Sequence, residues 1–85
     1  MPEISRFLGI IIYMYYRDHL PAHFHAIYGE YEIKVNIDSG IIEGKFPPRA
    51  LNAVLEWYKE YKEDLILDWK LSEQGKPLNK IPPLE

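Results

Sequence analysis

Hydrophobic and polar residues alternate over residues 31–37, and this is the clearest pattern in the chain. A period of two is typical of a β-strand with one buried face and one face in water. The turn residues Asp-Ser-Gly follow, and residues 41–43 then predict a short edge strand that ends at Gly44. In the strand over residues 31–37, the apolar and aromatic positions expected to face a core are Tyr31, Ile33, Val35 and Ile37.

The chain before this strand is rich in β-branched and aromatic residues. Residues 4–7 and 10–16 predict two more strands, because such side chains fit a pleated sheet. Residues 10–16 contain no alternating polar side chains, so both faces of that strand are expected to be covered in part. Residues 23–28 alternate again, and the period of two places His23 and His25 on the same face of a further strand.

A helical pattern follows the predicted strands. Residues 49–71 contain no Gly or Pro, and their apolar residues recur at steps of three and four. An unbroken helix of this length would extend roughly 35 Å at ~1.5 Å per residue, which exceeds the span of a sheet in so small a protein. We therefore expect a bend or break near Lys62, with Asp64 as the cap of a second helix.

These patterns predict one α+β domain over residues 1–85. An antiparallel sheet of four to five strands occupies residues 1–46, one long or two shorter helices in residues 47–74 cover it, and residues 75–85 form an extended tail. The apolar residues of that tail are expected to lie on the domain itself or on a partner. A chain of 85 residues leaves no room for a second domain.

Composition excludes several classes of protein. The chain has no cysteine, so it has no disulfide and no cysteine-based zinc site, and the cytoplasm is the expected location. The longest apolar run, residues 7–16, is about half of what a bilayer crossing needs, so we expect a soluble protein with no membrane partner. The net charge of −3 argues against a broad basic surface for nucleic acid.

Residues 17–25 carry the candidate chemistry. All three histidines of the chain lie in this stretch of nine residues, beside Arg17 and Asp18. Histidine is the side chain whose charge changes most readily near neutral pH, and its clustering with an arginine and a carboxylate favours a functional site.

Several motifs along the chain match one known family. The residues concerned are Met1 to Phe7, Gly9, residues 18–25 (Asp-His-Leu-Pro-Ala-His-Phe-His), Tyr28-Gly29-Glu30-Tyr31, Gly44-Lys45, Pro48-Arg49-Ala50 and Glu56-Trp57. Together they resemble a family of small prokaryotic proteins, the domain-of-unknown-function family numbered 4160. The resemblance implies a small partner protein encoded nearby and gene pairs of the toxin–antitoxin type, and it implies no established activity.

One hypothesis for the histidine stretch is a metal site. His23 and His25 share a strand face, and His19 or Asp18 can return from the preceding turn as further ligands. Imidazole and carboxylate together suit zinc or another divalent transition ion. His19 decides between chemistry and scaffold, because its ring either converges on the other two or folds back on its own turn.

A second hypothesis is acid–base chemistry on nucleic acid without a metal. Two of His19, His23 and His25 would exchange protons with the reacting oxygens, and Arg17 would stabilise the phosphate charge. Tyrosines such as Tyr13, Tyr15 and Tyr28 would stack on bases. These are the parts of a small ribonuclease, although the acidic net charge lowers the affinity expected for phosphates. The candidate contacts for a partner or for nucleic acid are Arg17, Lys45 and Arg49.

A third hypothesis is that the histidines fix a turn or bind a protein, with their ring nitrogens bonded to the backbone or to Asp18. The overall expectation is a regulatory module of the toxin–antitoxin type, without a cofactor, that binds a small partner protein. Nucleic acid is a further candidate partner. The alternative is a small histidine-driven or metal-dependent hydrolase, above all a ribonuclease. The edge strand over residues 41–43 also invites a homodimer.

Overall fold

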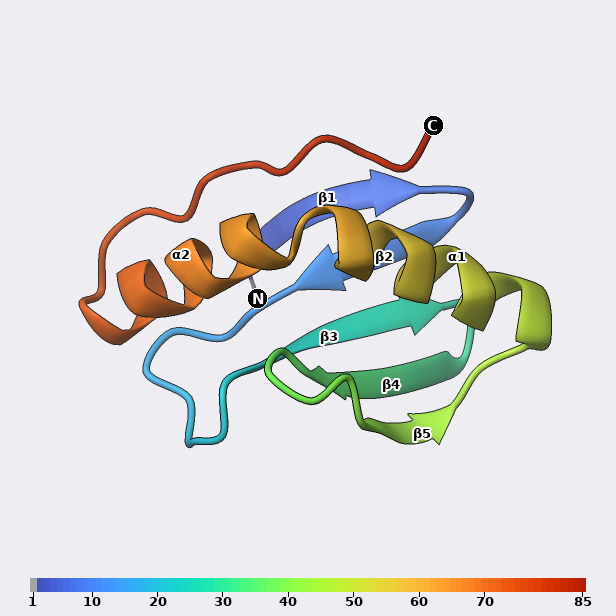
Figure 1. Cartoon of the computed structure of the whole chain (residues 1–85), viewed down its shortest axis with the longest axis horizontal. Helices are drawn as coiled ribbons and strands as arrows, with labels where there is room; N and C mark the ends of the chain where they lie inside the picture. Colours follow the sequence, from blue (N-terminus) through green and yellow to red (C-terminus); the bar gives the residue numbers. More distant parts are fainter. Residues whose placement is uncertain (1) are drawn as a thin grey trace.

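Figure 1 shows the computed structural model, which describes residues 2–85. The α+β fold class is confirmed, with an N-terminal antiparallel sheet followed by two helices. The strands pair in sequence order, so the sheet is a simple meander. The elements are β1 (Glu3–Phe7), β2 (Ile10–Tyr13), β3 (His23–Tyr28), β4 (Tyr31–Asn36), β5 (Ile42–Lys45), α1 (Pro48–Glu60) and α2 (Lys62–Glu73).

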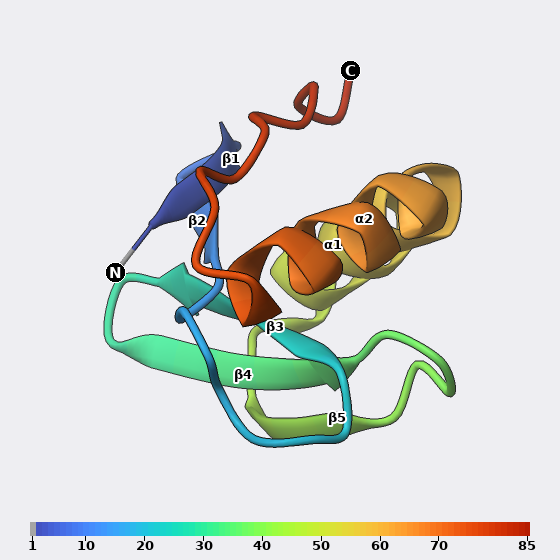
Figure 2. The same ribbon diagram turned by 90° about the vertical axis from the view of Figure 1, so that its left-hand side faces the viewer.

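Both helices lie on the same face of the sheet, and the core lies between them and the strands (Figure 2). The alternation expected over residues 31–37 is confirmed for Ile33 and Val35 of β4 and for Ile37, which follows the strand directly, since all three side chains are buried. Tyr31 is 45% exposed, because it pairs with Tyr28 next to the β3–β4 turn, at the end of the strand pair. The other face of the sheet carries the histidines of β3.

Two strands differ by more than one residue from the bounds that the pattern predicts, while β1 and β4 differ by a single residue and β3 matches. β2 ends at Tyr13 instead of continuing to residue 16, and the chain leaves the sheet in a loop over residues 14–22. β5 continues through Gly44, where φ is +106°. A side chain at Gly44 would place its Cβ 2.4 Å from the carbonyl oxygen of Glu32, so only glycine lets the edge strand approach β4 here.

The predicted break between the helices is confirmed one residue before Lys62. Tyr61 leaves helical geometry with φ −114° and ψ 25°, and α2 starts at the next residue. Asp64 does not cap α2, because it already lies in the first turn of that helix. Its negative charge there interacts favourably with the positive end of the helix dipole. Neither α1 nor α2, the two helices of residues 2–85, is long and apolar enough to cross a membrane.

The C-terminal tail packs on the domain itself and runs beside β1 (Figure 1). Ile81 is buried, and its backbone N–H donates to the carbonyl of Ile4 at 2.8 Å. The indole N–H of Trp57 donates to the carbonyl of Pro82 at 2.8 Å. The tail therefore covers the outer edge of the sheet next to β1 and closes the core on that side.

Asp68 of α2 anchors the start of the tail from a fully buried position. Its Oδ1 accepts the backbone N–H of Asn79 at 2.9 Å, while its Oδ2 is buried without a hydrogen-bond partner. Burial raises the pKa of this carboxyl above its usual value of 3.8, because the charged form loses its hydration. The fold therefore carries a cost for ionising Asp68.

We predict that Asp68→Asn stabilises the protein at pH 7 by roughly 1 kcal/mol, because it keeps the acceptor for Asn79 and removes a buried charge. Because the pKa of Asp68 is higher in the folded than in the unfolded protein, the unmutated protein loses stability as the pH rises from the unfolded pKa to the folded one. The gain should therefore shrink on acidification and vanish below the unfolded pKa near 3.8. Thermal unfolding from pH 3 to pH 8 measures this difference.

Asp68→Ala is the matched control. It also removes the charge, but it leaves the N–H of Asn79 without its acceptor, which costs about 1–3 kcal/mol. An asparagine variant that is less stable than the unmutated protein at pH 7 would contradict the assignment of a buried ionisation cost.

Candidate functional site

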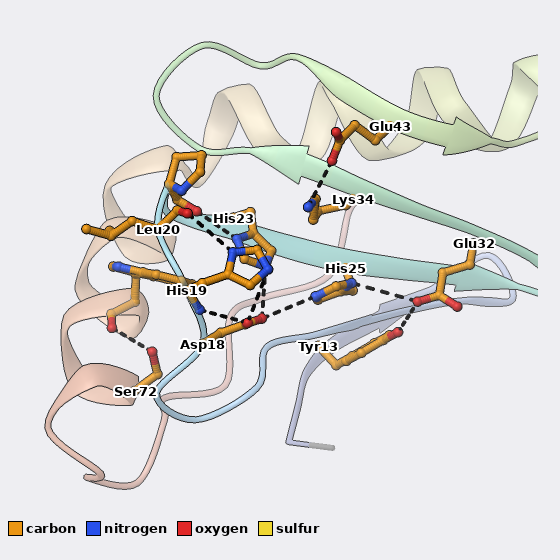
Figure 3. A network of polar contacts seen from close by, with 12 residues as sticks. Tyr13, Asp18, His19, Leu20, His23, His25, Glu32, Lys34, Glu43 and Ser72 are labelled. Atoms are coloured by element: carbon orange, nitrogen blue, oxygen red, sulfur yellow. Dashed lines mark hydrogen bonds and ion pairs between the residues drawn. The ribbon is translucent and has the colours of Figure 1, made fainter.

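The histidines lie at the end of the sheet where the loop over residues 14–22 joins β2 to β3 (Figure 3), and His23 there also packs against Trp69 of α2, with ring centres 5.2 Å apart. His23 and His25 belong to β3, and the period of the strand places both on the same face, as the sequence predicts. The side chains of Phe24 and Ala26 point to the opposite, core-facing side of the same strand and are fully buried. β3 is the central strand of the sheet, so the two histidines rest on its most supported part.

Asp18 comes from the loop and lies between the two strand histidines. Its Oδ2 is 2.9 Å from Nε2 of His23 and 3.7 Å from Nε2 of His25. Burial alone would raise the pKa of this carboxyl, but the hydrogen bonds from the backbone N–H of His19 and from His23 outweigh burial and hold the pKa below its usual value. Asp18 is therefore a carboxylate at neutral pH.

His23 is only 2% exposed, and both of its ring nitrogens face acceptors. Nδ1 lies 2.7 Å from the carbonyl oxygen of Pro21, so it must carry a proton and donate. Nε2 faces the carboxylate of Asp18. With Nδ1 donating to Pro21, Nε2 meets the carboxyl group of Asp18 either as a second N–H donor or as a lone pair beside a proton or cation that Asp18 shares.

His25 has the same orientation with fewer partners. Its Nδ1 lies 3.7 Å from Oε2 of Glu32, an oxygen that also accepts the hydroxyl of Tyr13 at 2.6 Å. Its Nε2 is buried and has no hydrogen-bond partner. Burial, and then the positive charge of His23, lower the pKa of His25, so the ring is neutral and its free nitrogen is able to bind a metal.

The spacing of the three donor atoms fits a metal ion. The side-chain donors of Asp18, His23 and His25 all lie within 4.8 Å of one another. Two ligands of one ion with bonds of ~2.1 Å are about 3.0–3.4 Å apart in octahedral or tetrahedral geometry. The separations of 2.9 and 3.7 Å from Oδ2 of Asp18 lie on either side of this range, while the separation of the two histidine nitrogens is bounded only by the 4.8 Å of the whole group. The three side chains would therefore have to draw together around an ion.

His19 lies at the mouth of the site. Its side chain is 68% exposed, its Nε2 is 3.8 Å from Oδ1 of Asp18, and its ring centre is 5.3 Å from that of His23. Its Nδ1 lies 3.3 Å from the carbonyl of Leu20. The ring of His19 therefore bonds to its own turn and does not join the buried group of Asp18, His23 and His25, so the predicted convergence of all three histidines is not observed. Its exposed edge faces solvent at the mouth of the site.

The predicted cationic residues lie apart from this group. The backbone of Arg17 donates to Ser72 at the end of α2, and its guanidinium lies against Gly75, where a Cβ would be 2.8 Å from Nη2. Lys45 lies on the helix-free face in the edge strand, opposite Glu32. Arg49 starts α1 at the other end of the sheet, in a hollow that it shares with Leu8 and Tyr28.

Sequence reasoning gave no role in the site to Glu32, Lys34 and Glu43, and it expected Tyr13 to stack on bases, whereas Tyr13 is buried beside His25. The strand register places Tyr13, His25, Lys34 and Glu43 in one row across β2, β3, β4 and β5. Glu32 follows in the next row and reaches back to Tyr13 and His25. The alternation of β4 predicts that Glu32 and Lys34 face away from the core, but only the register shows which histidine they meet.

A family model for a domain of unknown function, DUF4160, matches residues 9–70 of this chain. The matched range contains the loop and β3, and with them Asp18, His19, His23 and His25. No protein with a curated description and no solved structure matches the chain. Because the family model spans more than half of the sequence and includes the whole histidine site, the chain belongs to this domain-of-unknown-function family, DUF4160.

Proposed function

We propose that the protein is a small metal-dependent hydrolase whose divalent transition ion is held by Asp18, His23 and His25. The observation that carries the proposal is the matched orientation of the two strand histidines. In each ring Nδ1 faces an acceptor, the carbonyl of Pro21 or the carboxylate of Glu32, while Nε2 faces Asp18. Metal-binding histidines have this arrangement, and in His23 the 2.7 Å hydrogen bond from Nδ1 to Pro21 fixes the ring and its tautomer, whereas the 3.7 Å between Nδ1 of His25 and Glu32 is too long for a hydrogen bond.

Two imidazoles and one carboxylate suit zinc, iron or manganese, and three protein ligands leave a position for water. When bound, such an ion lowers the pKa of that water and supplies a nucleophile at neutral pH. His19, exposed at the mouth, is placed to exchange a proton with the substrate or its leaving group. The site thus contains a metal-activated nucleophile and a separate acid–base group.

RNA is the substrate class that we favour. Tyr15 is 42% exposed and contacts the ring of His25 edge-on, with ring centres 5.1 Å apart, so an unpaired base can stack next to the proposed ion. The net charge of −3 disfavours contacts with many phosphates along a nucleic-acid backbone. We therefore favour short, single-stranded RNA as the substrate.

The metal site predicts that untagged protein binds zinc or manganese at one site per chain. Binding to the folded state alone should raise stability by about 2.7 kcal/mol at a free-ion concentration of 100 times the dissociation constant. Asp18→Asn and His25→Asn each remove one ligand and should abolish both binding and stabilisation. Calorimetric titration and thermal unfolding measure the two effects.

His19→Asn is the matched control, because it removes a histidine of the same stretch from outside the buried group. Its metal affinity should stay within about threefold of the unmutated value. Metal affinity that is unchanged in Asp18→Asn, or no saturable binding of any divalent transition ion, would refute the proposed site.

Catalysis is tested with short single-stranded RNA and the metal-loaded protein. We expect His19→Asn to lower the cleavage rate by about 10²- to 10⁴-fold at unchanged metal occupancy, because it removes the acid–base group alone. Asp18→Asn should abolish cleavage together with metal binding. Full activity of the Asp18 variant in the presence of a chelator would show that the cleavage does not depend on the ion.

A second candidate function, partner binding of the toxin–antitoxin type, is favoured by an apolar groove next to the site. Leu20 is 72% exposed at the rim of this groove, and Pro21 lies in it and also bonds to His23 through its carbonyl. A small protein seated here would cover the mouth of the histidine site. The remaining lining residues are Ala22, Asp38, Ile66, Trp69, Lys70 and Glu73.

Partner binding predicts that a small protein encoded beside this gene forms a stable complex with the chain when the two are co-expressed. Leu20→Asp should weaken the complex by about tenfold or more, because it places a charge in an apolar contact. Leu8→Asp is the control, since Leu8 is 71% exposed at the other end of the sheet. Equal affinity of the two variants would exclude the groove as the contact.

A further inference from the structure

A second hollow adjoins the histidine site on the helix-free face of the sheet. His23 forms part of its wall, and Pro21 and Ile41 supply apolar sides. Both ring nitrogens of His23 are already taken by Pro21 and Asp18, so this ring offers the hollow no free nitrogen. The polar groups that remain to meet a ligand belong to Lys34, Asn36 and Glu43.

Asn36 offers a hydrogen-bond donor whose identity the fold determines. Its Oδ1 accepts two backbone N–H groups, from Asp38 at 2.9 Å and from Ser39 at 3.0 Å. Two donors on the same atom identify that atom as the oxygen, so the other side-chain atom is the NH₂ group. Among the described residues, this NH₂ group donates to no other group, and Asn36 lines the hollow.

Lys34 supplies the positive charge. The register places it directly opposite His25, and its side chain is one-third exposed. Its Nζ pairs with Oε2 of Glu43 at 2.9 Å, and Glu43 is two-thirds exposed on the edge strand. An ion pair so open to water is weak and screened by salt, so an anionic ligand can displace Glu43 from Lys34 at little cost.

We propose that this hollow is an anion subsite, in which Lys34 and Asn36 hold a phosphate group of the substrate beside the ion at Asp18, His23 and His25. The inference rests on the proposed hydrolase function and deepens it, since it assigns phosphate as the group bound next to the reacting centre. An ammonium and an amide NH₂ are both donors, which matches the acceptor-only oxygens of phosphate. Glu43 is then a competitor that occupies Lys34 until the ligand arrives.

This competition distinguishes the subsite from a surface ion pair. Lys34→Met should weaken phosphate binding by about tenfold or more, because it removes the charged donor. Glu43→Gln should do the opposite and tighten binding by about two- to fivefold, because it removes the competing carboxylate. A merely structural ion pair would give the same small loss of stability in both variants and no opposite effects on a ligand.

The test is a titration of metal-free, untagged protein with inorganic phosphate at constant ionic strength, followed by nitrogen–proton NMR. We expect saturable shifts of the side-chain NH₂ signals of Asn36 and the two opposite changes in affinity. Lys59→Met, which removes an exposed lysine of α1, is the matched control and should bind as the unmutated protein does. Equal affinity of Lys34→Met and unmutated protein, or shifts that leave the NH₂ signals of Asn36 in place, would overturn the inference.

A separate titration with zinc or manganese keeps the two proposals distinguishable. Metal binding without Lys34-dependent phosphate binding removes the anion subsite and leaves the metal site standing. Lys34-dependent phosphate binding without metal binding confirms the subsite as an anion site and refutes the hydrolase mechanism.

Discussion

The contact between Asp18 and His23 is the interaction on which the rest of the site depends. Asp18 lies in a loop, yet its carboxylate reaches a ring that is only 2% exposed. Removing Asp18 would leave Nε2 of the buried His23 without its partner, which is more costly than losing a partner in an exposed pair. The loop reaches this position because Arg17 takes a left-handed φ of +52° and donates its backbone N–H to Ser72 of α2. Helix, loop and central strand therefore position the carboxylate together.

Much of the fold follows from local patterns. Three local patterns each predict an element with a buried face: the alternation over residues 31–37, the apolar run from residue 10 and the helical spacing after Pro48. Each pattern can be recognised without knowing which distant residues cover that face. The features that sequence missed depend on neighbours. Tyr31 is exposed where it pairs with Tyr28 beside the turn, at the end of its strand. Gly44 continues β5 because only glycine lets the chain approach the backbone of Glu32 so closely.

The site was predictable in its strand part and much less so in its loop part. The period of two is enough to bring His23 and His25 to one face. No sequence rule states that Asp18 reaches both rings while Arg17, the residue before it, turns towards Gly75. Lys34 and Glu43 join the same region through strand register, which is a long-range property that the pattern of a single strand does not contain.

The polar groups of the site are arranged at a cost that packing alone does not explain. A buried Nε2 on His25 without a partner loses its hydration and gains no hydrogen bond, and a row of apolar side chains would avoid this loss. The same holds for His23, which can donate to both acceptors only by carrying a charge in a buried place. In the proposed metal site, a divalent ion held by Asp18, His23 and His25 would relieve both costs at once, because both Nε2 atoms would then have a partner. The unsatisfied nitrogen of His25 therefore supports the proposed metal site more directly than any feature of the turn does.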